Sequence, residues 1–252
     1  MKMQSYRRLW VGIFVFFLSV QSPSPASPQK PGDGISPEEL YALMKKKEVS
    51  VICTESYLEC MDGRIPDSLC ISCEEFGKKA TTLLKDKNKP IVLYCGSETC
   101  NEGCSAVDQV KNAGYKKIYI LSGGLYAWKA AGYRIETPDR VPRVHVPSVK
   151  PVMLEKWLNE KKEILILDVR PEAVFEKAHI EGAVNIPLYQ LHRRYYELPY
   201  NRKVVVVDEN GEHSYLASSY IARKGVDDVT RLSGGMAGWN AFAAKGKKKL
   251  KK

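Results

Sequence analysis

Histidine is absent from the first 144 residues of this 252-residue chain, and cysteine is absent from the last 148. The histidines are His145, His179, His192 and His213, whereas all seven cysteines lie between Cys53 and Cys104. A Cys–His dyad of the protease type is therefore excluded in the first half, unless the centre of the chain or the second half supplies the base. Disulfides and thiol chemistry are excluded from the second half.

The folded part of the chain also lacks an excess of charge of one sign. The formal net charge is +10, but residues 1–26 supply three of these charges and the lysines of residues 245–252 supply six more. The remainder is close to neutral and gives no support for nucleic-acid binding. We expect the Lys-rich tail, residues 245–252, to be solvated and disordered, with a weak contact to anionic lipid or an acidic partner as the alternative.

The apolar run near the amino terminus is too short to span a membrane comfortably. It extends from Leu9 to Val20, follows Lys2, Arg7 and Arg8, and precedes a small-x-small site at Ser24-Pro25-Ala26. We expect residues 1–26 to be a signal peptide that exports the protein to the periplasm or another extracytoplasmic space, with an uncleaved anchor as the alternative. In such a compartment the cysteines indicate disulfides, and their odd number leaves at least one unpaired.

Two copies of one unit account for most of the chain. With Ile52 aligned to Leu167, residues 49–72 match residues 164–187 without a gap, "KPIVLYC" matches "RKVVVVD", and "GYKKIYILSGGLYAW" matches "GVDDVTRLSGGMAGW". We expect the first domain over residues 34–137 and the second over residues 151–244. The four prolines of residues 138–151 predict a semi-rigid linker over residues 138–150.

Each copy alternates short apolar segments with helical ones. Strands are predicted near residues 49–53, 91–94, 117–121, 164–168, 204–207 and 229–232. A capping box from Ser36 to Glu39 opens the first helix of copy one, and Pro151 lies near the start of its counterpart. This pattern is typical of an α/β fold with a parallel sheet covered by helices on both faces. Such sheets bind ligands at the carboxyl ends of their strands, which is where Cys53, Cys95, Asp168 and Asp208 fall.

Both copies resemble the rhodanese family of sulfurtransferases. "LDVRPEAVFEKAHIEGAVNIP" in the second copy is similar to the family's amino-terminal signature, and "LSGGLYAW" and "LSGGMAGW" are similar to its carboxyl-terminal signature. The resemblance implies two rhodanese-like domains, each a small parallel sheet flanked by helices on both faces. In active members a cysteine directly after the central strand takes a sulfane sulfur as a persulfide and passes it to a thiophilic acceptor.

The resemblance places that nucleophile at Cys95 in the first copy and at Asp208 in the second. A carboxylate cannot form a persulfide, so we expect the second domain to be inactive. The expected partners are a small sulfane-sulfur donor or a persulfide, and a thiol acceptor that is a small molecule or a protein; no cofactor and no metal is implied. The active-site loop would comprise Gly96, Ser97, Glu98, Thr99, Cys100, Asn101, Glu102, Gly103 and Cys104.

This loop lacks the cation that an anionic substrate needs. Between Cys95 and Lys111 there is no arginine or lysine, and two glutamates add negative charge. Phosphatase activity, known in proteins that share the fold, is therefore not expected. The loop should bind thiosulfate weakly for the same reason, so we expect weak activity on thiosulfate and a better reaction with a thiol persulfide or polysulfide.

The crowded cysteines leave alternatives open. Cys100 stands where rhodanese loops commonly have a basic residue, and it is a candidate resolving partner for Cys95. The other interpretations are a structural disulfide in the loop and a buried Cys104 that acts as a small apolar residue. Three functions follow: a sulfurtransferase, a thiol-disulfide or sulfur-relay redox protein using Cys95 and Cys100, and a non-catalytic rhodanese-fold binding module.

The first copy departs from the family pattern at its own signature. Cys53 replaces the aspartate and Glu55 the arginine that the second copy retains as Asp168 and Arg170, which we expect to form an ion pair. The motif Cys70-Ile-Ser-Cys73 has the spacing of a zinc knuckle or a redox pair. We expect instead disulfide pairing among the four cysteines Cys53, Cys60, Cys70 and Cys73.

Overall fold

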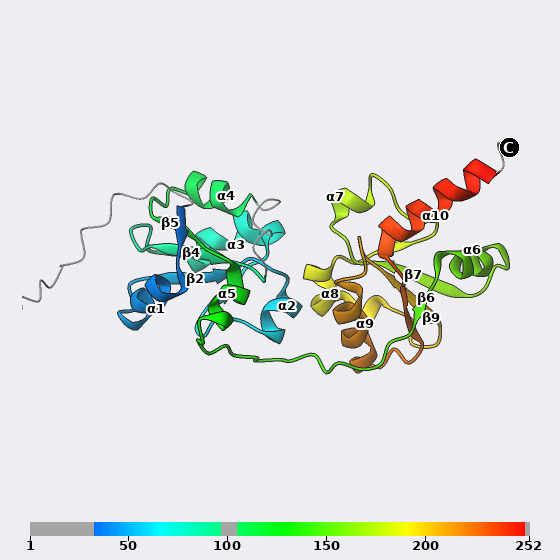
Figure 1. The fold of residues 1–252 in the computed structure, drawn as a ribbon, viewed down its shortest axis with the longest axis horizontal. Helices are drawn as coiled ribbons and strands as arrows, with labels where there is room; N and C mark the ends of the chain where they lie inside the picture. Colours follow the sequence, from blue (N-terminus) through cyan, green and yellow to red (C-terminus); the bar gives the residue numbers. More distant parts are fainter. Residues whose placement is uncertain (1–32, 97–104, 250–252) are drawn as a thin grey trace, which may run out of the picture.

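The computed structural model describes residues 33–96 and 105–249 of the chain, which form two similar halves (Figure 1). The expected signal peptide, residues 1–26, lies outside the described residues. The same holds for residues 97–104, which include Cys100 and Cys104. For residues 246–249 only the backbone is described.

The first domain is a five-stranded parallel sheet in the order β1-β5-β4-β2-β3. Its elements are β1 (Asp33–Ile35), α1 (Pro37–Lys45), β2 (Ser50–Cys53), α2 (Tyr57–Asp62), β3 (Leu69–Cys70), α3 (Phe76–Leu83), β4 (Ile91–Tyr94), α4 (Ala106–Asn112), β5 (Ile118–Leu121) and α5 (Gly124–Ala130). The predicted capping box forms at the start of α1, where the Ser36 hydroxyl accepts from the Glu39 amide and the Glu39 carboxylate accepts from the Ser36 amide.

The second domain repeats this topology in the order β6-β10-β9-β7-β8. Its elements are β6 (Ser148–Val149), α6 (Pro151–Asn159), β7 (Ile164–Asp168), α7 (Glu172–Phe175), β8 (Val184–Asn185), α8 (Leu188–Arg194), β9 (Lys203–Val207), α9 (Ser214–Arg223), β10 (Val229–Leu232) and α10 (Gly235–Lys249). The register confirms the alignment of the copies, because Ile52 pairs with Leu69 just as Leu167 pairs with Val184.

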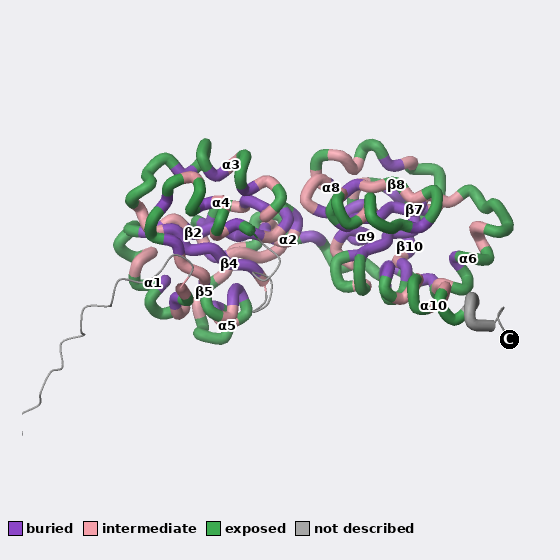
Figure 2. Tube along the Cα trace, turned by 90° about the horizontal axis from the view of Figure 1, so that it is seen from above, coloured by how far each residue is buried: buried purple, intermediate pink, exposed green. Residues whose placement is uncertain are grey.

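All six predicted strands are present, and the sheets have helices on both faces, as expected. Four further strands, β1, β3, β6 and β8, are two or three residues long and lie at the sheet edges. They were not predicted because a segment this short carries no apolar run. In the first sheet, Val51 and Val92 pack under α1, α2 and α5, whereas Ile52 and Leu93 pack under α3 and α4. Figure 2 shows these buried strands at the centre of each domain.

The segment between the domains packs mainly on the second. Val141 and Val146 are buried in the core of that domain, and β6 pairs with β10 as its edge strand. Arg223 of α9 binds Asp139 at 2.9 Å. The proline-rich segment therefore contributes to the second domain's packing over much of its length.

The two domains meet where α2 packs against α8 (Figure 1). Leu58 of α2 is 2% exposed and belongs to the core cluster of the second domain, with Leu188 and Leu191. Beside it the ring of Tyr57 stacks on His192 with centroids 4.2 Å apart. Burial of a leucine side chain contributes about 2 kcal/mol, so α2 anchors one domain to the other.

The expectation of a disordered Lys-rich tail is wrong up to Lys249, because α10 continues to that residue. Alanine and lysine have high helix propensity and extend the helix beyond the packed turns that hold Met236. Within residues 33–96 and 105–249, no helix has the length and apolarity needed to cross a bilayer.

The Leu-Ser-Gly-Gly segments close each sheet against the residue in the nucleophile position. The Leu125 amide donates to the Cys95 carbonyl at 2.7 Å, and the Met236 amide donates to the Asp208 carbonyl at 2.8 Å. Gly235 has φ +56°, and a Cβ atom there would lie 2.5 Å from the Asp208 carbonyl oxygen. Only glycine allows the turn to approach the strand end this closely.

This close approach predicts a large difference between two glycine substitutions in the second domain. Gly182→Ala, at φ +79° with no atom within 4 Å of the new Cβ, should cost only the conformational strain, about 1 kcal/mol. Gly235→Ala should cost roughly 3 kcal/mol, since the clash adds to the strain. Urea unfolding followed by circular dichroism measures both, and equal losses would contradict the role given to the contact.

Candidate functional site

The carboxyl edges of the two sheets face a common cavity of about 320 Å³ between the domains. The first domain lines it with the residues that follow β2 and with α2, and the second domain lines it with the residues that follow β7 and β9. Its described charged residues are Glu55, Glu59, Glu74, Arg170, Asp208, Glu209 and His213. Arg170 and His213 are each already bonded to carboxylates, so the cavity is acidic.

Cys95 lies directly after β4, at the predicted edge of the sheet, and is 2% exposed. Its sulfur is in a disulfide, and so is that of Cys73, in bridges other than Cys60–Cys70. Gly96 is the only predicted loop residue that falls among the described residues. Ser97, Glu98, Thr99, Cys100, Asn101, Glu102, Gly103 and Cys104 lie outside them.

Glu55 lies against the peptide that follows Cys95. Its Oε1 atom accepts from the Gly96 amide at 2.7 Å, and a Cβ atom on Gly96 would lie 2.6 Å from the same oxygen. Burial raises the pKa of Glu55 to about 7, and the negative charge of Glu59 adds to this effect. The sequence showed that a glutamate replaces the family's arginine here, but not that it contacts the loop.

Glu59 connects this carboxyl group to the second domain. Its side chain closes a capping box at the start of α2, and its Oε1 atom lies 3.2 Å from His213 Nε2. The bond from Glu59 raises the pKa of His213 to about 9. The pKa of Glu59 is lowered, because the bonds from His213 and Ser56 outweigh its burial. This pair was not predicted, and the capping-box spacing from Ser56 to Glu59 is the only signal in the sequence for its first member.

Asp208 is buried and fully bonded in the position that a cysteine would hold. Its carboxylate accepts from the backbone amides of Gly211, His213 and Ser214, at 2.9, 2.8 and 3.0 Å. Ser214 is the first residue of α9, so the negative charge also lies at the positive end of a helix. The loop's amide groups are thus used by the protein's own carboxylate.

The expected ion pair between Asp168 and Arg170 is present. Arg170 Nη2 lies 2.7 Å from Asp168, and Nη1 lies 3.2 Å from Glu209, which also belongs to the second domain. In the first domain the aspartate is replaced by Cys53, a free thiol with no exposed surface, so the expected disulfide pairing of Cys53 is wrong. Burial raises its pKa far above the usual range, so Cys53 is an unreactive core residue.

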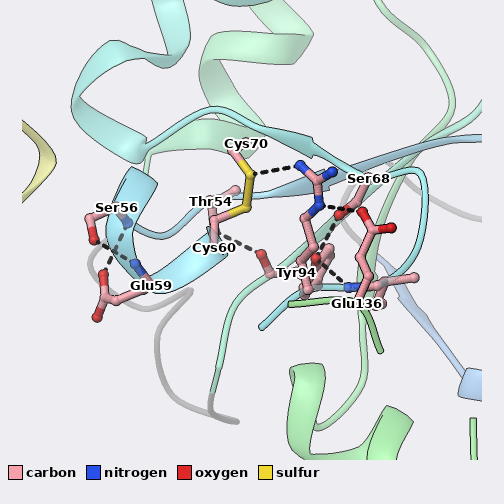
Figure 3. The surroundings of a disulfide bond; sticks show 10 residues. Thr54, Ser56, Glu59, Cys60, Ser68, Cys70, Tyr94 and Glu136 are labelled. Atoms are coloured by element: carbon pink, nitrogen blue, oxygen red, sulfur yellow. Dashed lines mark hydrogen bonds and ion pairs between the residues drawn. A yellow bond between two sulfur atoms is a disulfide. The ribbon is translucent and has the colours of Figure 1, made fainter. Parts of the chain in front are cut away.

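A disulfide between Cys60 and Cys70 ties α2 to β3 (Figure 3). Arg64 packs beside it, with Nη1 3.5 Å from the Cys70 sulfur and Nε 2.5 Å from Glu136. The bridge fixes the helix that carries Glu59. Within residues 33–96 and 105–249, no cluster of three or more histidine, cysteine or acidic side chains is placed to hold a metal ion.

Comparison with known proteins identifies the repeated unit. The family model described as "Rhodanese-like domain" matches residues 36–131 and 151–242. A protein named "Thiosulfate sulfurtransferase GlpE" from Shewanella oneidensis is 34% identical over 83 residues, which are 33% of this chain and 82% of that protein. A protein named "Sulfurtransferase" from Allochromatium vinosum is 30% identical over 86 residues, 34% of this chain and 80% of that protein.

A third relative is longer than the aligned region. A protein named "Putative sulfur carrier protein YrkF" from Bacillus subtilis is 30% identical over 111 residues, which are 44% of this chain and 57% of that protein. Each of the three alignments is thus about as long as one repeat.

The buried Glu55 carboxyl group makes stability depend on pH. Its pKa in the folded state is above the usual 4.5, so folding favours the protonated form, and stability falls as the pH rises from about 4.5 through 7. Glu55→Gln removes this loss and should raise the free energy of unfolding at pH 8 by about 2 kcal/mol, with little effect at pH 4.5. Urea unfolding at the two pH values, with the exposed Glu155→Gln as control, measures the difference. An equal effect of Glu55→Gln at both values would contradict the assignment.

Proposed function

The chain belongs to the rhodanese-like domain family, and on this premise we propose that it is a sulfurtransferase whose reacting sulfur is that of Cys95. One observation carries the proposal: Cys95 directly follows the central strand β4 at the edge that faces the cavity, whereas the matching position holds the fully bonded Asp208. The names of the relatives from Shewanella and Allochromatium support sulfur transfer as the type of reaction.

The disulfide at Cys95 requires a reduction before transfer. A thiol reductant attacks the bridge, and two thiols are oxidised to one disulfide while Cys95 and its former partner become thiols. The Cys95 thiolate then attacks the outer sulfur of a persulfide donor. A new S–S bond forms on Cys95, the donor's S–S bond breaks, and the donor leaves as a thiolate. Attack by an acceptor thiolate on the outer sulfur reverses these roles and regenerates the Cys95 thiolate.

The charges around the cavity favour a persulfide over thiosulfate. Glu55, Glu59 and Glu74 come from the first domain, and the guanidinium of Arg170 is bonded to Asp168 and Glu209. A dianion meets stronger repulsion here than a persulfide, which carries one charge or none. We therefore expect weak activity with thiosulfate.

A second candidate function is favoured by the same disulfide. If Cys100, the candidate resolving residue, is the partner of Cys95, the pair would work as a thiol-disulfide or sulfur-relay couple. The Cys100 thiolate would then attack the inner sulfur of the Cys95 persulfide. The disulfide between the two cysteines would form again and the outer sulfur would leave as hydrosulfide, instead of passing to an acceptor.

Mass spectrometry of the full chain tests both functions. After reduction, removal of the reductant and incubation with glutathione persulfide, the peptide that contains Cys95 should gain one sulfur atom, and Cys95→Ser should abolish transfer to an acceptor thiol. Cys100→Ser should retain transfer, and Cys53→Ser is the matched control because Cys53 is buried and free. A Cys95 peptide that never gains sulfur would refute the sulfurtransferase, and a bridge that re-forms with loss of sulfur would support the redox couple.

We also propose that residues 1–26 export the protein. The basic start, the apolar run and the small residues that follow support this. Amino-terminal sequencing of the protein from the extracytoplasmic fraction should find residues 1–26 removed. An intact amino terminus in the cytoplasmic fraction would contradict the proposal.

A further inference from the structure

The second domain, which has aspartate in the nucleophile position, contributes a side chain to the site of the first. His213 lies in the loop that follows Asp208, and its Nε2 atom is 3.2 Å from Glu59 Oε1 across the interface. Its own backbone amide donates to Asp208 Oδ2 at 2.8 Å. The imidazole is therefore held by one domain and bonded to the other.

Two hydrogen-bonded contacts, joined by the electrostatic interaction between Glu59 and Glu55, connect His213 to the peptide at Cys95. Glu59, which His213 binds, acts electrostatically on Glu55 and raises its pKa. Glu55 accepts the Gly96 amide at 2.7 Å, and Gly96 directly follows Cys95. Glu59 and His213 are both charged near neutral pH, and Glu55 has a pKa of about 7, so its charge changes in this range.

We propose that His213 is a positioning residue for the reaction at Cys95: as a cation it orients Glu59 and offsets the two carboxylates, so that the sulfur can carry negative charge. A thiolate or persulfide anion on Cys95, whose neighbour Gly96 is bonded to Glu55, is otherwise disfavoured by repulsion between like charges. The first domain has no histidine, and no arginine or lysine lies between Cys95 and Lys111. The proposal rests on the proposed function, because it assigns His213 a part in the reaction of Cys95.

The aspartate at position 208 holds the loop that carries His213 in place. A cysteine sulfur is a weak hydrogen-bond acceptor, whereas the Asp208 carboxylate accepts three amides, those of His213 and Ser214 among them. Asp208, which occupies the nucleophile position of the second domain, therefore also holds the loop that carries His213.

Other charged groups face the same region and contribute to the balance of charge around Glu55, Glu59 and His213. The cations are Lys129 of α5, Arg140 and Arg143 of the connecting segment, and the bonded Arg170. The anions besides Glu55 and Glu59 are Asp62, Glu74, Asp208, Glu209 and Glu212. The bond to Glu59 raises the pKa of His213 to about 9, so the imidazole keeps its positive charge at neutral pH and loses it only above about 9.

The test is the pH dependence of Cys95 alkylation in the reduced full-length chain, with iodoacetamide as the probe and the Cys95 peptide resolved by mass spectrometry. His213→Gln should raise the midpoint of the rate profile by about half a pH unit, which lowers the rate at pH 7 about threefold. Glu55→Gln should shift the midpoint down by a similar amount. Asp208→Asn should also raise the midpoint, but by less than His213→Gln does, because the amides of the loop lose a charged hydrogen-bond acceptor.

Two control variants separate this effect from a loosened interface or a general loss of histidine. Arg193→Gln breaks the ion pair of 2.5 Å between Arg193 and Glu75, which also crosses the interface but lies outside the charge chain. His179→Gln removes an exposed histidine that stacks on Phe175 in the second domain. Neither should move the midpoint. If Arg193→Gln moves it as far as His213→Gln does, or if His213→Gln leaves it unchanged, the proposal is overturned.

The outcome can be distinguished from failure of the proposed function. If Cys95 gains no sulfur in the unaltered protein, the sulfurtransferase proposal fails whatever the alkylation profile shows. If Cys95 gains sulfur and His213→Gln leaves the alkylation profile unchanged, only the role of His213 fails. Circular dichroism of each variant confirms folding, and the opposite shifts expected for Glu55→Gln and His213→Gln cannot arise from a shared loss of structure.

Discussion

The burial of Leu58 in the core of the second domain is the contact on which the arrangement of the site depends. Leu58 is one of four consecutive residues of α2 with separate roles. Tyr57 stacks on His192, Glu59 binds His213, and Cys60 forms the bridge to Cys70. Because the apolar contact brings α2 against α8, the ion pair next to it lies at the cavity, where burial strengthens the interaction of charges. The disulfide keeps the short helix in place on its own sheet.

The two domains have diverged in complementary ways. The first keeps a cysteine after its central strand but has lost the aspartate and arginine of the family signature. The second keeps that pair as Asp168 and Arg170, bonded at 2.7 Å, but has a carboxylate in the nucleophile position. In the second domain the amides of the loop that follows β9 are bonded to the carboxylate of Asp208. The carboxyl edge of that domain's sheet forms one wall of the cavity that Glu55 and Glu59 of the first domain also line.

The electrostatics of the cavity follow from the replacement of the signature arginine in the first domain. Replacing an arginine by Glu55 places an acid against the Gly96 amide, where burial and Glu59 raise its pKa to about 7. An acidic site next to a sulfur nucleophile disfavours anionic donors unless a cation offsets it. In the described structure the cation bonded to Glu59 comes from the other domain, as His213.

The sequence by itself determined the repeat, the six principal strands, the α/β class and the ends of the strands at which Cys95 and Asp208 lie. These features depend on local apolar runs and on a self-alignment, which need no knowledge of contacts. It also predicted the pairing of Asp168 with Arg170, since the two residues are close along the chain. Only the tertiary structure decided that Cys60 pairs with Cys70, that Cys95 is in a disulfide, and that Glu59 meets His213. Glu59 and His213 are 154 positions apart in different repeats, and no pattern within either repeat specifies how two sheet edges pack together.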